Sequence, residues 1–213
     1  MGNKLSLVYD KLSSLLSVFK SDKQVSLTIL GLDAAGKTTL VNLLRGETLH
    51  TVPTIGFNAE EITIDKTTIR LWDVGGQTSI IVFWREYVKT TDGLIFVIDL
   101  ADKDRFELAY NAFKQLTDDL RENIPVFLLL NKTDLLSSEE KHENVSKIKK
   151  LFNFDEQGGM VANGKKYRCK IMECSVQNEQ KNLLQNQSYS VESSNIYSGF
   201  RWVMRVADGK EGF

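Results

Sequence analysis

Residues 31–38 read Gly-Leu-Asp-Ala-Ala-Gly-Lys-Thr, which matches the pattern G-x-x-x-x-G-K-[ST]. Residues 25–30 before it are apolar and predict a strand, and residues 37–45 predict a helix. A glycine-rich turn between a strand and a helix presents successive backbone N–H groups at the helix N-terminus, where they attract anions. The motif therefore predicts a strand–loop–helix unit that binds phosphate groups, and it restricts the fold to those that contain such a unit.

Three residues of this loop have distinct expected roles. Gly36 allows the backbone to approach phosphate closely, Lys37 neutralises the charge of a β- and γ-phosphate, and the Thr38 hydroxyl is placed to bind Mg²⁺. The residues predicted to bind nucleotide here are Asp33, Ala34, Ala35, Gly36, Lys37, Thr38 and Thr39. A glycine-rich turn without a ligand is the alternative interpretation, and the loop alone does not separate ATP from GTP.

The rest of the chain alternates between predicted strands and predicted helices. Strands are predicted at residues 25–30, 57–64, 67–72, 94–100, 126–130 and 167–173, and helices at residues 37–45, 104–121, 139–152 and 195–207. This order predicts an α/β fold with a doubly wound, mostly parallel six-stranded sheet flanked by helices. Two segments do not fit the alternation: residues 155–166 are predicted to be a loop, and residues 177–194 a polar surface insertion.

Composition limits the classes of function. Lys and Arg number 27 and Asp and Glu number 28, which lacks the basic excess of nucleic-acid-binding proteins, so no nucleic-acid partner is expected. Cys169 and Cys174 are too few for a disulfide framework and favour a reduced, cytosolic compartment. No apolar run approaches the roughly 20 residues that span a bilayer, and serines and charges in the first residues argue against a secretory signal. We expect one main domain, residues 21–213, after an N-terminal segment of residues 1–20.

A second motif, Asn131-Lys-Thr-Asp134, directly follows the predicted strand at residues 126–130. Asp134 can accept hydrogen bonds from N1–H and the 2-amino group of guanine, whereas adenine lacks these donors and would leave the carboxylate unpaired. Lys132 can lay its aliphatic stem over the base, and Asn131 can link this segment to the phosphate-binding loop. The motif therefore predicts guanine, although Asn and Asp after a strand also occur in ordinary turns.

A weaker third element follows the last predicted strand. It consists of Cys174, Ser175 and Val176, and the backbone N–H of Ser175 is expected to meet guanine O6. An ordinary exit from a strand is the alternative. With Asn131, Lys132 and Asp134, these residues complete the predicted base site.

The segment Asp73-Val-Gly-Gly76-Gln77 also follows a predicted strand and carries the expected sensors of the γ-phosphate. Asp73 would hold Mg²⁺ through a water, the Gly76 N–H would contact the γ-phosphate, and Gln77 would orient the attacking water. Thr54 would bring a second hydroxyl to Mg²⁺ while the γ-phosphate is present, so hydrolysis would let both segments relax. Gln77 and Lys37 are the predicted catalytic residues. For Asp73 and Thr54, a turn aspartate and an exposed loop threonine are the alternatives.

Four segments together resemble the ADP-ribosylation-factor and ADP-ribosylation-factor-like small GTPases: GLDAAGKTT, PTIGFN, WDVGGQ and NKTD. The resemblance is strongest between about residues 20 and 135, and PTIGFN and WDVGGQ are specific to this branch of the Ras superfamily. It implies the P-loop small GTPase fold, GTP or GDP with Mg²⁺, and a cycle that needs a guanine nucleotide exchange factor and a GTPase-activating protein. It also implies effectors that bind through residues 46–58 and 73–88. The two segments outside the alternation depart from the family's pattern.

The N-terminus adds a membrane signal. Residues 1–6 fit the pattern M-G-x-x-x-[ST], which predicts myristoylation of Gly2, and one such chain binds a membrane only marginally. Residues 4–19 are predicted to form an amphipathic helix whose apolar arc would supply a second membrane contact; a helix packed on the core is the alternative. In the resembling family this helix is stowed in the GDP form and released to membrane in the GTP form. The resemblance implies a cytoplasmic, peripheral membrane protein of the Golgi or another endomembrane.

The sequence therefore predicts a monomeric GTP-binding protein that hydrolyses GTP slowly and switches membrane association and effector binding in membrane trafficking. Arg70 and Arg85 lie near the motifs but lack the context of an arginine finger. We therefore expect an activating protein to supply about 10³–10⁵ in rate. Two alternatives are a P-loop ATP-binding enzyme and a non-hydrolysing GTP-binding scaffold.

Overall fold

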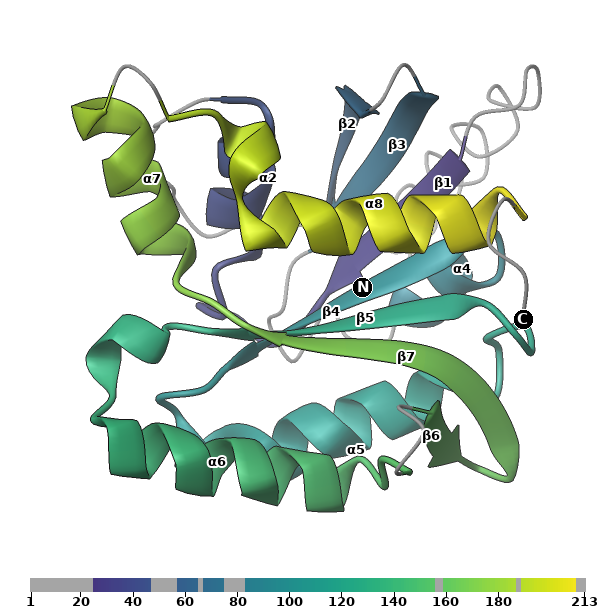
Figure 1. The fold of residues 1–213 in the computed structure, drawn as a ribbon. Helices are drawn as coiled ribbons and strands as arrows, with labels where there is room; N and C mark the ends of the chain where they lie inside the picture. Colours follow the sequence, from purple (N-terminus) through teal and green to yellow (C-terminus); the bar gives the residue numbers. More distant parts are fainter. Residues whose placement is uncertain are drawn as a thin grey trace, which may run out of the picture.

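The computed structural model describes residues 25–46, 57–64, 67–74, 83–155, 159–186 and 189–209. Its strands are β1 Val25–Leu30, β2 Phe57–Ile64, β3 Thr67–Val74, β4 Gly93–Asp99, β5 Pro125–Asn131, β6 Gly159–Ala162 and β7 Lys165–Glu173. They form one seven-stranded sheet in the order β2-β3-β1-β4-β5-β7-β6 (Figure 1). The sheet separates two layers of helices.

The strand directions confirm the predicted fold class. The five inner strands, β3, β1, β4, β5 and β7, pair in parallel. Each edge carries one antiparallel strand, β2 beside β3 and β6 beside β7. The fold is therefore a doubly wound, mostly parallel α/β sheet, but it has seven strands rather than the six predicted.

The additional strand belongs to a hairpin that the sequence prediction treated as a loop over residues 155–166. Asn163 and Gly164 connect β6 to β7 with φ of 48° and 76°, and Ala162 lies opposite Lys165. A two-residue turn with positive φ at both positions matches the twist of a hairpin, and Asn-Gly is its preferred sequence. The loop prediction was wrong for residues 159–162, although the Asn-Gly pair was present as a signal.

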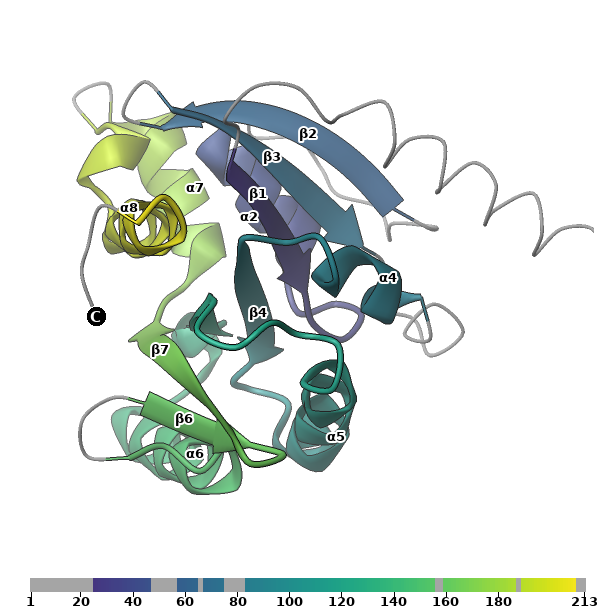
Figure 2. The same ribbon diagram turned by 90° about the vertical axis from the view of Figure 1, so that its right-hand side faces the viewer.

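The helices divide between the two faces of the sheet. Their bounds are α2 Lys37–Leu44, α4 Trp84–Val88, α5 Phe106–Leu116, α6 Ser138–Leu151, α7 Val176–Gln185 and α8 Asn195–Ala207. One hydrophobic cluster joins α4, α5 and α6 to the sheet and the other joins α2, α7 and α8, as the end-on view shows (Figure 2). In β4, Phe96 belongs to the first cluster, whereas its neighbours Ile95 and Val97 belong to the second. A strand buried on both faces is apolar throughout, which explains the continuous run that predicted it.

The segment predicted as a polar surface insertion, residues 177–194, contains most of α7. The Ser175 hydroxyl caps this helix by accepting a hydrogen bond from the Asn178 N–H at 3.1 Å. Val176 is buried, and Leu183 packs against the cluster that contains α2 and α8. A helix needs only one apolar stripe to be held by packing, so the abundance of Asn and Gln misled the prediction.

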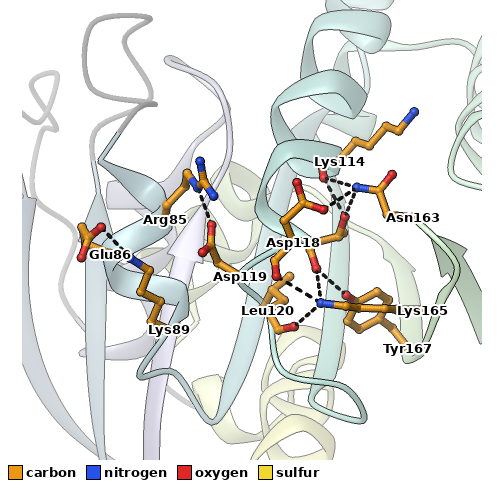
Figure 3. Close-up of polar contacts among 11 residues, drawn as sticks. Arg85, Glu86, Lys89, Lys114, Asp118, Asp119, Leu120, Asn163, Lys165 and Tyr167 are labelled. Carbon is orange, nitrogen blue, oxygen red and sulfur yellow. Dashed lines mark hydrogen bonds and ion pairs between the residues drawn. The ribbon is translucent and has the colours of Figure 1, made fainter.

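Helix α5 is shorter than the predicted range of residues 104–121, because a 3₁₀ turn precedes it and its last turn ends at Leu116. The β6–β7 hairpin caps that end (Figure 3). Lys165 Nζ donates to the carbonyl oxygens of Thr117, Asp118 and Leu120 at 2.9, 3.1 and 3.2 Å. A cation beside the last carbonyls of a helix stabilises that terminus.

Several sequence predictions fall outside the described residues. These are Gly2 with the helix at residues 4–19, and the loop residues Thr54, Gly76 and Gln77. Among the residues that the structure does describe, no helix has the length and apolar character needed to cross a membrane.

Candidate functional site

The carboxyl ends of the parallel strands bring the predicted motifs to one edge of the sheet. β1 leads into the loop at Gly31, β5 ends at Asn131, and β7 leads into Cys174. Asp99, the last residue of β4, lies opposite Asn131 in the strand register. This edge is where open α/β sheets bind their ligands, so the topology places the phosphate loop and the base motif together.

The phosphate-binding loop depends on two glycines with positive φ. Gly31 has a φ of 147°, and a Cβ there would lie 2.2 Å from the carbonyl oxygen of Val97, so a side chain would push the loop away from β4. Gly36 has a φ of 98°, and a Cβ there would lie 2.3 Å from Asn131 Nδ2. Both positions therefore require glycine for close approach as well as for backbone conformation.

Lys37 begins α2 and lies across the loop. Its side chain is buried, and Nζ donates to the carbonyl oxygens of Gly31 and Leu32, each at 2.9 Å. Thr38 and Thr39 follow in the first turn, and no described side chain caps this end of α2. A helix N-terminus with a lysine at its mouth provides the donors and positive charge that suit a chain of phosphates.

Asn131 joins the two predicted loops. Its side-chain Nδ2 donates to the Ala35 carbonyl oxygen at 2.8 Å, and its Oδ1 accepts from the Val176 N–H at 3.0 Å. The Cys174 thiol lies 3.7 Å from the same Oδ1. Asn131 is only 3% exposed, so these partners replace water, and the link expected from the sequence is present.

The rest of the base motif is held in a defined conformation. Lys132 has a left-handed φ of 67°, and its Nζ forms an ion pair with Asp99 Oδ2 at 2.7 Å. The Thr133 N–H donates to the Cys174 carbonyl oxygen at 3.1 Å, which ties the motif to the segment after β7. Asp134 is exposed and has no hydrogen bond or ion pair with another described residue, so its carboxylate is available as an acceptor.

Burial raises the pKa of the Cys174 thiol, and the nearby carboxylates of Glu179 and Asp134 raise it further. The thiol therefore stays neutral at physiological pH. A neutral, buried cysteine in this position is a small packing residue rather than a nucleophile.

The structure adds contacts that sequence reasoning missed. Arg105 Nη1 pairs with the loop carboxylate of Asp33 at 2.8 Å, and Arg105 Nε pairs with Asp102 at 2.5 Å. No sequence pattern predicts this pair, whereas the pairing of Lys132 with Asp99 could have been expected, since Asp99 ends β4 and Lys132 follows the neighbouring strand β5. The two arginines considered earlier face elsewhere: Arg70 pairs with Glu61 at 3.2 Å, and Arg85 pairs with Asp119 (Figure 3).

The predicted magnesium ligands are only partly within the described structure. Thr38 lies in α2 at the mouth of the loop, and Asp73 is the next-to-last residue of strand β3, although its side chain is not described. Among the described residues, no group of three His, Cys, Asp or Glu side chains could hold a metal ion. A site built from threonine hydroxyls, one carboxylate and phosphate oxygens would not form such a group, so the donor set fits Mg²⁺, which prefers few protein ligands.

Comparison with known proteins gives a consistent result. The family model described as the ADP-ribosylation factor family matches residues 12–206. An ADP-ribosylation factor from Encephalitozoon cuniculi is 38% identical over 161 residues, which cover 75% of this chain and 78% of that protein. ADP-ribosylation factor-like protein 4A from Mus musculus is 41% identical over 164 residues, which cover 73% and 78% of the two chains. The solved small GTPase Arl6 (BBS3) from Trypanosoma brucei, with the nucleotide analogue GppNp bound, has a similar fold, with a TM-score of 0.64 at 20% identity over 89% of this chain and 100% of that one.

Proposed function

Since this chain belongs to the ADP-ribosylation factor family of small GTPases, we propose that it cycles between GDP-bound and GTP-bound states at the edge of the sheet where Asn131 joins the two loops. The family accounts for a GTP-binding switch in general. The assignment of roles to residues, the slow rate of hydrolysis and the membrane cycle are our proposals for this chain.

The bridge made by Asn131 is the observation that carries the proposal. One amide holds the carbonyl of Ala35 in the phosphate loop and the N–H of Val176 beyond the base motif, at 2.8 and 3.0 Å. A ligand with a base at one end and phosphates at the other needs these loops at a fixed separation. An asparagine in an ordinary turn forms hydrogen bonds with its own backbone a few residues away, whereas Asn131 bonds to two other segments of the chain.

The proposed roles follow from the chemistry of each group. The loop from Asp33 to Thr39 binds phosphate oxygens through backbone N–H groups, and Lys37 neutralises their charge. Asp134 accepts hydrogen bonds from guanine, Lys132 covers the base while Asp99 orients its ammonium at 2.7 Å, and the Ser175 N–H meets the base oxygen. Thr38, Thr54 and Asp73 would hold Mg²⁺, which when bound neutralises charge on the β- and γ-phosphates.

Hydrolysis is assigned to Gln77, which orients the attacking water, with Gly76 as the γ-phosphate contact. No arginine finger is proposed within the chain, because Arg105 is held by Asp33 and Asp102 and Arg85 is held by Asp119. An activating protein would therefore contribute about 10³–10⁵ in rate. Effectors and the exchange factor would bind through residues 46–58 and 73–88.

The membrane part of the cycle is proposed from the sequence. A myristoyl group on Gly2 and the apolar face of residues 4–19 would together anchor the GTP form at an endomembrane, since one acyl chain alone binds only marginally. Flotation of the acylated protein with liposomes tests this part. Equal flotation of the GDP form and the form with a non-hydrolysable GTP analogue would reject the membrane cycle and leave the GTPase proposal intact.

Single-turnover hydrolysis tests the enzymatic proposal. The protein is loaded with GTP, and phosphate release is followed with and without cell extract as the source of an activating protein. We expect slow release alone, acceleration by extract, and loss of that acceleration in Gln77→Leu with nucleotide still bound. Stimulated turnover in Gln77→Leu equal to that of the wild type would reject the role of Gln77, and no hydrolysis in any condition would favour a scaffold.

A further inference from the structure

Helix α7 lies beside α2, the helix that begins at the phosphate loop (Figures 1 and 2). Residues 177–194, one of the two segments that depart from the family's pattern, contain most of α7. Through Val176 and Gln180, α7 contacts both Asn131 and the helix that follows the phosphate loop.

The first turn of α7 is continuous with residues 174–176, the segment predicted to meet the guanine base and called the base segment below. Ser175 is both the residue whose N–H is assigned to the base and the N-cap of α7, where its hydroxyl accepts from the Asn178 N–H at 3.1 Å. Val176, the first helical residue, is 1% exposed and donates its N–H to Asn131 Oδ1 at 3.0 Å. A displacement of α7 would therefore move the base segment with it.

The middle of α7 is attached to α2. Gln180 Nε2 donates to the carbonyl oxygen of Thr39, in the first turn of α2, at 3.5 Å. Leu183, one turn further along α7, packs against the hydrophobic cluster that includes Leu40 and Leu43 of α2. The outer face of α7 carries Gln177 and Leu184, which are exposed, and Leu184 has 66% of its surface accessible.

The segment that follows α7 also contacts the helix, at Glu179 in its first turn. The Tyr189 hydroxyl donates to the Glu179 carboxylate, so the segment after the helix folds back along it. Val191 then packs against the same cluster as Leu183. α7 is thus fixed in its first turn, at Val176 and Glu179, and in its middle, at Gln180 and Leu183.

We propose that α7 is a brace that slows the release of guanine nucleotide, with Gln180 and Leu183 as positioning residues. This inference rests on the proposed function. On this proposal, nucleotide leaves when residues 174–176, which lead into α7, separate from the phosphate loop. The middle of α7 is attached to α2, the helix that follows that loop. Separation must therefore break the bond from Gln180 to α2 and disturb the packing of Leu183 on the cluster that contains α2, which raises the barrier to release without adding a contact to the ligand.

Two matched pairs of variants on the same helix test the brace. Full-length protein is loaded with a fluorescent GDP analogue in the presence of Mg²⁺, and its release is followed after addition of excess GDP. Gln180→Ala is compared with Gln177→Ala, and Leu183→Ala with Leu184→Ala, so that each inner residue has an exposed control of the same type. Association rates and melting temperatures are measured on the same samples.

We expect Gln180→Ala to release nucleotide about two- to five-fold faster than the wild type, the size of one modest hydrogen bond. Leu183→Ala should release it roughly ten-fold faster, because a half-buried leucine contributes more packing than one such bond. Both controls should stay at the wild-type rate, and all association rates should be unchanged. If the role of Gln180 were purely structural, the Gln180→Ala protein would melt at a lower temperature and release nucleotide at the wild-type rate.

Release from Gln180→Ala and Leu183→Ala at the wild-type rate would overturn the brace while leaving GTP binding intact. Equal acceleration in the inner variants and their exposed controls would overturn it as well, since the effect would then not pass through α2. A wild-type protein that retains no GDP analogue would overturn both the brace and the function on which it rests.

Discussion

The side chain of Asn131 donates to the carbonyl oxygen of Ala35 at 2.8 Å, although 96 residues separate the two in the chain. The donor lies at the end of β5 and the acceptor in the loop after β1, so the bond reaches past β4, which lies between these two strands in the sheet. The same amide accepts from the Val176 N–H. The loops that would hold the phosphates and the base are therefore built as one unit.

Replacement of Asn131 by Ala should separate these loops. The change leaves the Ala35 carbonyl and the Val176 N–H without their buried partner, which costs about 1–3 kcal/mol for each such group. Affinity for GDP should fall by roughly 5- to 150-fold, measured by the ratio of release and association rates. Asn144→Ala is the matched control, because Asn144 is also buried and donates to Leu100 O at 3.0 Å, and this bond involves neither Ala35 nor Val176.

The control should lose stability and keep its affinity for GDP. If Asn131→Ala and Asn144→Ala lose stability equally and both retain wild-type affinity, Asn131 is an ordinary buried asparagine and the account of the joined loops is wrong.

Replacement of Asp134 by Asn should change the preferred base. An amide can donate to the 2-oxo group of xanthine and accept from its N1–H, whereas it meets the 2-amino group of guanine with a donor. In competition binding, the variant should bind GDP more weakly and xanthosine diphosphate more tightly than the wild type does. The ratio of the two affinities should shift by roughly 10²-fold or more. Asp104→Asn, at an exposed position before α5, should leave the ratio unchanged. An unchanged ratio in Asp134→Asn would remove Asp134 from the base site.

The sequence was informative where local chemistry determines the structure. The glycines at 31 and 36 and the apolar runs of the central strands predicted a strand–loop–helix unit and a sheet buried on both faces, and the structure contains both. The link from Asn131 to the phosphate loop was also expected, since both follow parallel strands that end at the same edge.

Other features could not be predicted because they depend on contacts between distant segments. The pairing of Asp33 with Arg105 joins residues 72 positions apart; Asp33 occupies a variable position of the phosphate-binding motif, and Arg105 belongs to no motif. α7 is polar, so its helical state rests on the Ser175 cap and on packing against α2 rather than on composition. The β6–β7 hairpin is different, because its Asn163-Gly164 turn was a usable signal that was outweighed by the surrounding glycines.

The cap on α5 gives a prediction about stability alone. Lys165→Met keeps most of the aliphatic stem but removes three hydrogen bonds to carbonyl oxygens (Figure 3). The free energy of unfolding should fall by about 1–3 kcal/mol in urea denaturation, with GDP affinity unchanged. Lys166→Met is the control, since Lys166 is 62% exposed and, among the residues that the structure describes, pairs only with Asp155 at 3.1 Å, so its loss should cost about 0–1 kcal/mol. Equal losses in the two variants would show that the cap contributes nothing.

The buried thiols give a prediction about pH. Burial raises the pKa of Cys169, and of Cys174, above the ordinary value of 9.0, so the folded state keeps both protonated when the unfolded state loses its protons. Their contribution to stability is therefore fully present below pH 9.0 and is lost as the pH rises above it. Each thiol should lower the free energy of unfolding by about 1.4 kcal/mol per pH unit in that range.

Urea denaturation between pH 7 and 10 under reducing conditions measures this slope. Cys169→Ala should lose some stability at neutral pH through packing and should show a shallower decline above pH 9.0, because one of the two titrating groups is gone. A decline as steep as that of the wild type would show that Cys169 does not titrate in this way.

The central claim is that the loops joined by Asn131 hold a guanine nucleotide. Displacement of a bound fluorescent GDP analogue from the wild-type protein by GDP and by ADP, measured side by side in Mg²⁺, tests it most directly. The account predicts displacement by GDP and none by ADP at concentrations up to about 10⁴-fold higher, since adenine leaves the Asp134 carboxylate unpaired. Displacement by both at similar concentrations, or failure of the analogue to bind at all, would contradict it.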